Sequence, residues 1–150
     1  MMLSEELYPQ RVFYYFEQIA AIPHGSRNTK AISDFLVNFA KEHNLVWYQD
    51  ENNNVVIVKE ASAGYEAAEP IIIQGHMDMV CEKNKDVDHD FEKDPIELKI
   101  LDDMIYANGT TLGADNGIAV AMSLAILASN DVCHPQLEVL ITSNEEAGMT

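Results

Sequence analysis

Apolar residues recur at helical spacing in three parts of the chain. Residues 9–21 carry apolar side chains three and four positions apart, which predicts a helix with Pro9 in its first turn. A second amphipathic helix is predicted over residues 28–43. The third, over residues 116–129, is strongly apolar and is therefore expected to be buried.

Short runs rich in β-branched and aromatic residues predict strands between these helices. Residues 45–49 and 55–59 flank a polar loop, which indicates a hairpin. Residues 70–76 contain three consecutive isoleucines, and such an apolar run predicts a strand buried on both faces. Further strands are predicted at residues 96–100, 104–107 and 137–142.

The alternation of helices and strands predicts an α/β fold. Because some strands come as hairpins and others do not, we expect a mixed, twisted sheet flanked by helices. Residues 81–94 are polar and mixed in charge, which indicates a long loop. The chain shows no internal repeat and no domain boundary, so residues 1–150 are treated as one unit.

The charge of the chain excludes several classes of partner. Asp and Glu number 25 against 9 Lys and Arg, giving a formal net charge of −16. Nucleic acid and anionic membrane surfaces both need a basic face, so neither is expected as a partner. The start of the chain lacks a signal peptide, its apolar runs are too short to span a bilayer, and two cysteines make no disulfide framework. We therefore expect a cytoplasmic protein.

Polar residues with metal-binding chemistry stand at the ends of the predicted apolar elements. His76 and Asp78 follow one strand, Asp115 begins the third helix, and Glu145 and Glu146 follow the last strand. Sites in α/β sheets form beyond the carboxyl ends of strands. Imidazole together with carboxylates is a ligand set for Zn²⁺, Mn²⁺ or Co²⁺.

Each of these residues also has a plain structural interpretation. His76 could be a hydrogen-bonded structural residue, Asp115 a helix cap, and the Glu pair solvated surface. The joint pattern favours a metal site, in which Asp78 shares a face with His76 and orients its ring. In extended backbone Glu145 and Glu146 point in opposite directions, which predicts one general base and one ligand.

Other catalytic chemistries lack their motifs. The chain has no Gly-x-Ser-x-Gly elbow, no phosphate loop, no Gly-x-Gly-x-x-Gly and no His-Glu-x-x-His. Cys81 has no evident base and is expected to be a buried small apolar residue. The other histidines are expected to be solvated or capping: His24, His43, His89 and His134. Of these, His24 stays an open candidate because it lies near Ser26.

Four runs of the sequence resemble one known family. They are residues 74–80, which contain a His-x-Asp motif, and residues 22–26, 109–117 and 145–149. Together they are similar to the co-catalytic zinc aminopeptidases and carboxypeptidases, a family that includes aminoacylases, carnosine dipeptidases and tripeptide aminopeptidases. Within that family the runs are most similar to bacterial dipeptidases that cleave Xaa-His. The resemblance extends over essentially all 150 residues.

The resemblance implies a role for each candidate residue. His76 would bind one of two divalent metal ions, most simply zinc, with Mn or Co as alternatives, and Asp78 would orient it. Asp115 would bridge both ions, and Glu146 would bind the second. Glu145 would act as general base and acid in the hydrolysis of a dipeptide substrate.

The resemblance also implies that residues 1–150 are the N-terminal part of the catalytic domain. The family supplies another carboxylate ligand, another His ligand, and a lid and dimerisation domain after the Glu-Glu motif. We therefore expect the 150-residue chain to be inactive alone and the full-length enzyme to be a homodimer. The alternatives are another peptidase or N-acyl-amino-acid amidohydrolase of the same family, or a non-catalytic truncated module.

Overall fold

The computed structural model describes residues 3–148, which form helices and strands in alternation. All the predicted elements are present, with bounds within two residues of those expected, whereas the first helix and the last short one were not predicted. No helix in this part of the chain combines the length and apolarity needed to cross a bilayer. The elements are α1 (Leu3–Glu6), α2 (Gln10–Ala20), α3 (Lys30–Glu42), β1 (Val46–Gln49), β2 (Val55–Lys59), β3 (Ile71–His76), β4 (Leu98–Leu101), β5 (Met104–Ala107), α4 (Ala114–Leu127), β6 (Leu137–Thr142) and the 3₁₀ helix η1 (Glu145–Ala147).

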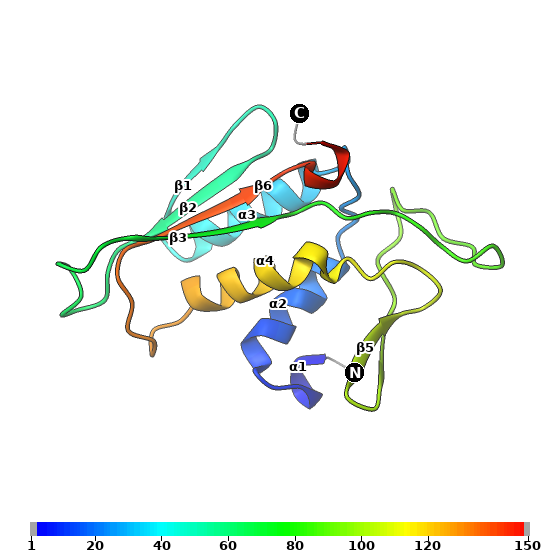
Figure 1. Ribbon diagram of the computed structural model, residues 1–150, viewed down its shortest axis with the longest axis horizontal. Coiled ribbons are helices and arrows are strands. Elements are labelled where there is room, and N and C mark those ends of the chain that lie inside the picture. The colour runs from blue at the N-terminus through cyan, green and yellow to red at the C-terminus, as the bar shows by residue number, and fades with distance from the viewer. Residues whose placement is uncertain (1–2, 149–150) are drawn as a thin grey trace.

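Four strands form a mixed sheet in the order β1-β2-β6-β3 (Figure 1). The first three are antiparallel neighbours, and β3 runs parallel to β6, with His76 opposite Thr142. Strands β4 and β5 form a separate two-stranded sheet that projects beside the N-terminal helices. The predicted mixed α/β architecture is confirmed.

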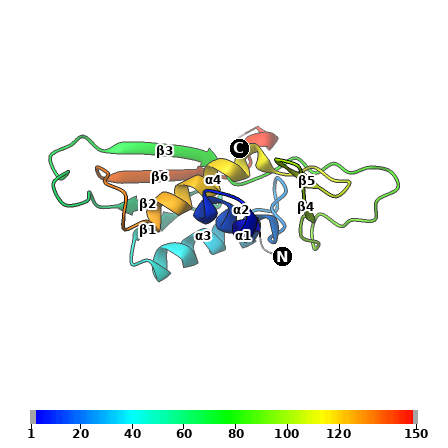
Figure 2. The same ribbon diagram turned by 90° about the horizontal axis from the view of Figure 1, so that it is seen from below.

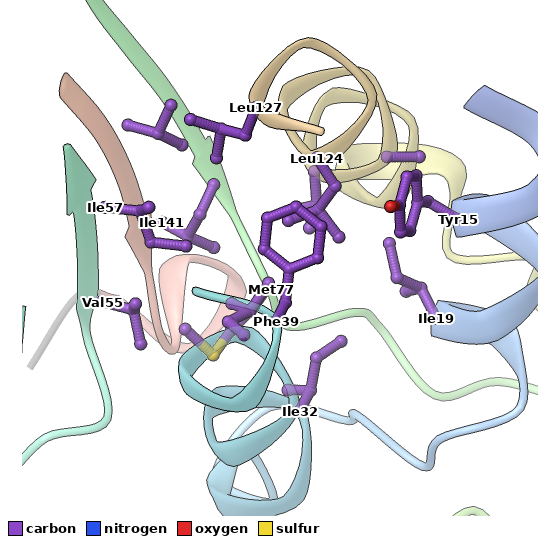
Figure 3. Packing of buried hydrophobic residues seen from close by; sticks show 14 of the residues in the cluster. Tyr15, Ile19, Ile32, Phe39, Val55, Ile57, Met77, Leu124, Leu127 and Ile141 are labelled. Atoms are coloured by element: carbon purple, nitrogen blue, oxygen red, sulfur yellow. The ribbon is translucent and has the colours of Figure 1, made fainter. Parts of the chain in front are cut away.

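The core lies on one side of this sheet (Figures 2 and 3). Side chains of β2 and β6 face those of α3 and α4, and α2 packs against α4. Burying one large apolar side chain contributes about 1.5–3 kcal/mol, so this layer supplies the main stabilisation. Its fully enclosed members include Ile19, Ile32, Leu36, Val55, Ile57, Val120, Leu124, Val139 and Ile141.

Strand β3 is less buried than its sequence predicts. Ile71 is 49% exposed and Ile72 is 67% exposed, so the expectation of burial on both faces is wrong. The strand lies at the sheet edge. Ile72 pairs with Glu138, the neighbour of the core residue Val139, so it belongs to the face turned away from the helices. Val46 and Tyr48 are also exposed on that face. Three isoleucines indicate a strand, but they do not say which of its faces the rest of the fold covers.

Glycines allow β3 and α4 to approach each other closely. A Cβ atom at Gly75 would lie 3.2 Å from the Cβ of Ala119 in α4. Gly113 precedes α4 as its N-cap, and its φ of 76° is in the left-handed region that favours glycine. The close approach brings the carboxyl end of β3 beside the first turn of α4.

Candidate metal centre

Three segments that are distant in sequence meet at the carboxyl ends of β3 and β6. His76 is the last residue of β3, and Asp115 lies in the first turn of α4. Glu145 and Glu146 begin η1, which follows β6 after two residues. Parallel pairing of β3 with β6 places both strand ends at one edge, where sites in α/β sheets form.

The imidazole of His76 lies at the centre of these groups. Its Nε2 is 3.0 Å from Oδ1 of Asp115 and 3.7 Å from Oε2 of Glu145. Its Nδ1 faces Asp78, at 3.2 Å from Oδ1 and 3.1 Å from the backbone oxygen. The ring is buried. Its Nδ1 faces the buried Asp78, and its Nε2 faces the exposed carboxylates of Asp115 and Glu145.

Asp78 is the buried centre of a hydrogen-bond network. The residue is 1% exposed, and its Oδ1 accepts the backbone N–H of Glu145 at 2.9 Å. Its Oδ2 accepts the backbone N–H of Glu146 at 3.1 Å and the hydroxyl of Ser26 at 2.6 Å. A buried carboxylate needs such partners, because an unpaired buried charge is very costly. Asp78 thus joins the end of β3 to η1.

Asp115 does not cap α4. The N-cap is Gly113, no side chain caps the helix, and Asp115 has non-helical dihedral angles of φ −93° and ψ 101°. Its side chain is 84% exposed and turns toward His76. The interpretation of Asp115 as a helix cap is therefore wrong, and the carboxylate of Asp115 is exposed and able to bind a metal ion.

Glu145 and Glu146 lie in a 3₁₀ helix and not in extended backbone. The expectation that an extended backbone would separate their side chains is wrong for that reason. The two carboxylates nevertheless differ in position. Glu146 offers an oxygen within 4.8 Å of ligand atoms on His76 and Asp115, whereas Glu145 places Oε2 beside the His76 ring.

His76, Asp115 and Glu146 bring metal-binding donor atoms close together. Their ligand atoms all lie within 4.8 Å of one another. Two ligands at about 2.0–2.2 Å from one tetrahedral zinc ion lie about 3.4 Å apart, so the side chains would have to move closer to share one ion. One imidazole nitrogen and two carboxylates are also the donor types that zinc binds.

The charge around His76 favours a cation. Burial on its own lowers the pKa of His76, but the hydrogen bonds to Asp115 and Asp78 and the charges of Asp78 and Glu145 outweigh it and raise the pKa above 6.5. Within residues 3–148, no Lys or Arg forms an ion pair with these carboxylates. The Lys and Arg ion pairs lie elsewhere, at Arg11–Asp131, Lys30–Asp34 and Lys93–Asp90.

Residues that the sequence did not single out hold the turn before η1. Asn54 accepts the backbone N–H of Ser143 at 2.8 Å, and Asn144 accepts the backbone N–H of Arg27 at 2.6 Å. Asn54 lies in a polar hairpin loop, where an asparagine carries no chemical signal in the sequence. Ser26 did lie in a run that carried the family resemblance, but nothing there indicated its partner.

Two other histidines are more buried than expected. His24 is 3% exposed and its Nδ1 lies 2.6 Å from the oxygen of Ile22, while His134 is buried with Nδ1 2.7 Å from the oxygen of Pro135. Burial lowers the pKa of His24. The expectation of solvated or capping residues is therefore wrong for both, and neither belongs to the His76 cluster.

The other two histidines and Cys81 lie closer to what the sequence predicts. His43 follows α3 and caps it through a contact of 2.9 Å between Nδ1 and the oxygen of Phe39. His89 is half-buried against Phe91. Cys81 is half-buried and packs on a small apolar cluster, so it is less enclosed than predicted.

Comparison with known proteins places the chain among peptidases. The model of Peptidase family M20/M25/M40 matches residues 72–150. The chain is 46% identical over 144 residues to the cytosol non-specific dipeptidase of Escherichia coli (strain K12), a match that covers 96% of this chain and 30% of that protein.

Solved structures agree with the sequence comparison. The aminoacylhistidine dipeptidase from Vibrio alginolyticus superposes with a TM-score of 0.95 at 44% identity, over 98% of this chain and 30% of that one. A tripeptidase from Staphylococcus aureus matches with a TM-score of 0.73 at 23% identity, over 93% of this chain and 37% of that one, which shows the shared fold alone. The chain thus spans under a third of the length of its two dipeptidase relatives.

Proposed function

Because this chain belongs to Peptidase family M20/M25/M40, we propose that the protein carrying it is a metallopeptidase that hydrolyses dipeptides. The observation that carries the proposal is the convergence of His76, Asp115 and Glu146 within 4.8 Å, with the carboxylate of Glu145 beside them. The activity is proposed for a longer protein, since the chain spans 30% of its dipeptidase relatives.

We propose that two divalent ions bind at this edge of the sheet. Asp78 engages Nδ1 of His76, which leaves Nε2 to bind the first ion. Asp115 is exposed and would be shared between both ions, and Glu146 would bind the second. Zinc suits this donor set best, and Mn²⁺ or Co²⁺ are alternatives.

Glu145 is the proposed general base. When bound, a divalent metal polarises the scissile carbonyl and acidifies the attacking water. Glu145 would accept the proton of that water at its carboxylate and pass it to the leaving amine. Its Oε2 lies 3.7 Å from Nε2 of His76, so the base is beside the ligand set without belonging to it. Asp78 keeps Glu145 there through its backbone N–H.

Residues 1–150 would be the N-terminal part of a catalytic domain. Catalytic zinc sites take about three protein ligands each, and His76, Asp115 and Glu146 do not complete two such sites. We propose that further ligands, together with a lid and dimerisation domain, belong to the longer protein, which would be a homodimer. The exposed apolar face of the sheet, with Val46, Tyr48 and Ile72, is consistent with further structure packing there.

Substrate specificity has two candidates. The Vibrio relative is named for aminoacylhistidine substrates and the E. coli relative is named a non-specific dipeptidase, at 44% and 46% identity. We propose Xaa-His dipeptides as the main substrates and broad dipeptide hydrolysis as the second candidate. We also propose a cytosolic location, which the name of the E. coli relative supports.

The test is an assay of the full-length protein. It is stripped with a chelator, reloaded with Zn²⁺, Mn²⁺ or Co²⁺, and offered β-Ala-His, other Xaa-His dipeptides, dipeptides without His, tripeptides and N-acyl amino acids. We expect metal-dependent turnover of dipeptides, highest for Xaa-His, and loss of turnover in His76→Ala. Equal rates on dipeptides with and without His would support the second candidate.

Three outcomes would reject the proposed dipeptidase. Preferred hydrolysis of N-acyl amino acids or tripeptides would assign a different activity of the same family. Metal-independent turnover would reject the metal-dependent mechanism, and no turnover on any substrate with metal bound would favour a non-catalytic module. A 150-residue version tested in parallel is expected to show no turnover.

A further inference from the structure

Ser26 makes a side-chain contact with the buried carboxylate of the site. Its hydroxyl donates to Oδ2 of Asp78 at 2.6 Å, and the same oxygen accepts the backbone N–H of Glu146 at 3.1 Å. The other oxygen, Oδ1, faces His76 and the backbone N–H of Glu145. Each carboxylate oxygen therefore has two partners, and Ser26 supplies one that belongs to neither β3 nor η1.

The backbone fixes Ser26 in this place from both sides. The backbone N–H of Met79 donates to the oxygen of His24 at 3.0 Å, and the N–H of Ser26 donates to the oxygen of Met79 at 3.2 Å. These two bonds flank a parallel bridge between Gly25 and Met79. Residues 24–26 thus run alongside the residues that follow β3, and the hydroxyl of Ser26 is held toward Asp78.

The same turn also contacts the segment that carries the Glu pair. The backbone N–H of Arg27 donates to Oδ1 of Asn144 at 2.6 Å. Asn144 is the residue immediately before η1. Residues 24–27 therefore contact both halves of the site: the end of β3 through Asp78 and the start of η1 through Asn144.

We propose that Ser26 is a positioning residue of the metal centre, which fixes the Asp78 carboxylate and, through it, the His76 ring and the start of η1. Without the hydroxyl, Oδ2 keeps a single donor, and the carboxylate can rotate away from Nδ1 of His76. An acceptor that orients a ligating imidazole controls metal affinity, although it does not touch the metal. The part of this inference that concerns metal affinity rests on the proposed function.

The experiment uses the full-length, metal-free protein with Ser26→Ala, Ser26→Thr and the matched control Ser123→Ala. Ser123 is also a buried hydroxyl, but it donates to the oxygen of Ala119 within α4, away from the site. Zinc affinity is measured by competition with a chromophoric chelator. We expect Ser26→Ala to bind zinc about tenfold more weakly, and Ser26→Thr and Ser123→Ala to bind within about twofold of the unaltered protein.

A second measurement on the same metal-free proteins does not depend on zinc. The amide protons of Glu145 and Glu146 both donate to Asp78, and their hydrogen exchange reports how firmly that carboxylate is held. We expect exchange at these two amides to be about tenfold faster in Ser26→Ala and unchanged in Ser123→Ala. Ser26→Thr is expected to restore slow exchange.

The two readouts separate this inference from the proposed function. If the unaltered protein binds no divalent metal, the proposed function fails, and the exchange rates still decide whether Ser26 positions Asp78. If exchange and zinc affinity in Ser26→Ala both equal those of Ser123→Ala, Ser26 has no positioning role. Equal loss in Ser26→Thr and Ser26→Ala would also overturn the proposal.

Discussion

Asp78 and Glu145 are 67 residues apart in the sequence and are joined by a hydrogen bond of 2.9 Å from the backbone N–H of Glu145 to Oδ1 of Asp78. The carboxylate that faces the His76 ring therefore also sets the position of the proposed base. The orientation of a proposed ligand and the placement of a proposed base depend on one buried group. Changes at Asp78 should consequently affect metal binding and turnover together.

Replacing Asp78 by Asn tests this dependence. The amide keeps the size of the side chain, but its NH₂ group donates where the carboxylate oxygen accepted. It would therefore face the backbone N–H of Glu145 or Glu146 without bonding it. We expect zinc affinity to fall by about 10–100-fold, the range found for partners of ligating histidines. The measurement is a chelator competition on the full-length protein. Asp34→Asn, at an exposed pair with Lys30, is the control and should leave the affinity unchanged.

Asp115→Ala separates a ligand from a structural residue. Asp115 is exposed and does not cap α4. We therefore expect the free energy of unfolding of the metal-free variant to lie within about 0.5 kcal/mol of that of the metal-free unaltered protein. Metal content should fall, because the proposed shared ligand is gone. Melting and elemental analysis are run on the same samples. A normal metal content in Asp115→Ala would remove Asp115 from the ligand set.

The sequence was sufficient to predict most helices and strands and to select residues that the structure brings close together. Helical spacing located α2, α3 and α4, and β-branched runs located the strands, because these patterns follow from burying one face of each element. His76, Asp115 and Glu146 could be selected because strand ends and helix starts in α/β folds meet at one edge.

Other features depended on tertiary structure that no local pattern encodes. The exposure of Ile71 and Ile72 follows from the position of β3 in the sheet and from which face the helices cover. The contact of Ser26 with Asp78 joins residues 52 positions apart. Asp78 accepts the first two backbone N–H groups of the 3₁₀ helix, from Glu145 and Glu146, and the sequence of the turn alone does not reveal this contact.

Lys59 offers a test of stability that is independent of the site. Its ammonium donates to backbone oxygens at the end of α4, including those of Leu127 at 3.1 Å and Ser129. A cation there bonds free carbonyls and interacts favourably with the helix dipole. We expect Lys59→Met to lower the free energy of unfolding by about 1–2 kcal/mol and to leave zinc affinity unchanged. Urea denaturation is the measurement, and Lys99→Met is the exposed control.

Asp50 predicts a dependence of stability on pH. The side-chain amide of Asn54, followed by the backbone N–H groups of Asn54 and Asn52, lowers the pKa of Asp50 below 3.8. Its contribution is therefore complete above the unfolded-state pKa and is lost as the pH falls through the lower folded-state pKa.

The expected outcome is a difference between two variants. Asp50→Asn should have a lower free energy of unfolding than the unaltered protein at pH 6. This gap in free energy should narrow as the pH falls below about 4. Asp103→Asn is the control, because Asp103 lies exposed in the β4–β5 turn, and it should show no such gap. Denaturation curves at a series of pH values measure both. A gap that stays constant down to pH 2.5 would contradict the role given to the Asp50 carboxylate.

The central claim is that Glu146 binds metal and Glu145 transfers the proton. It is tested most directly by measuring metal content and turnover in Glu145→Gln and Glu146→Gln of the full-length protein. We predict that Glu145→Gln keeps the metal equivalents of the unaltered protein and loses turnover by about 10²–10⁴-fold, whereas Glu146→Gln loses metal. Loss of a metal equivalent in Glu145→Gln with full occupancy in Glu146→Gln would contradict this account.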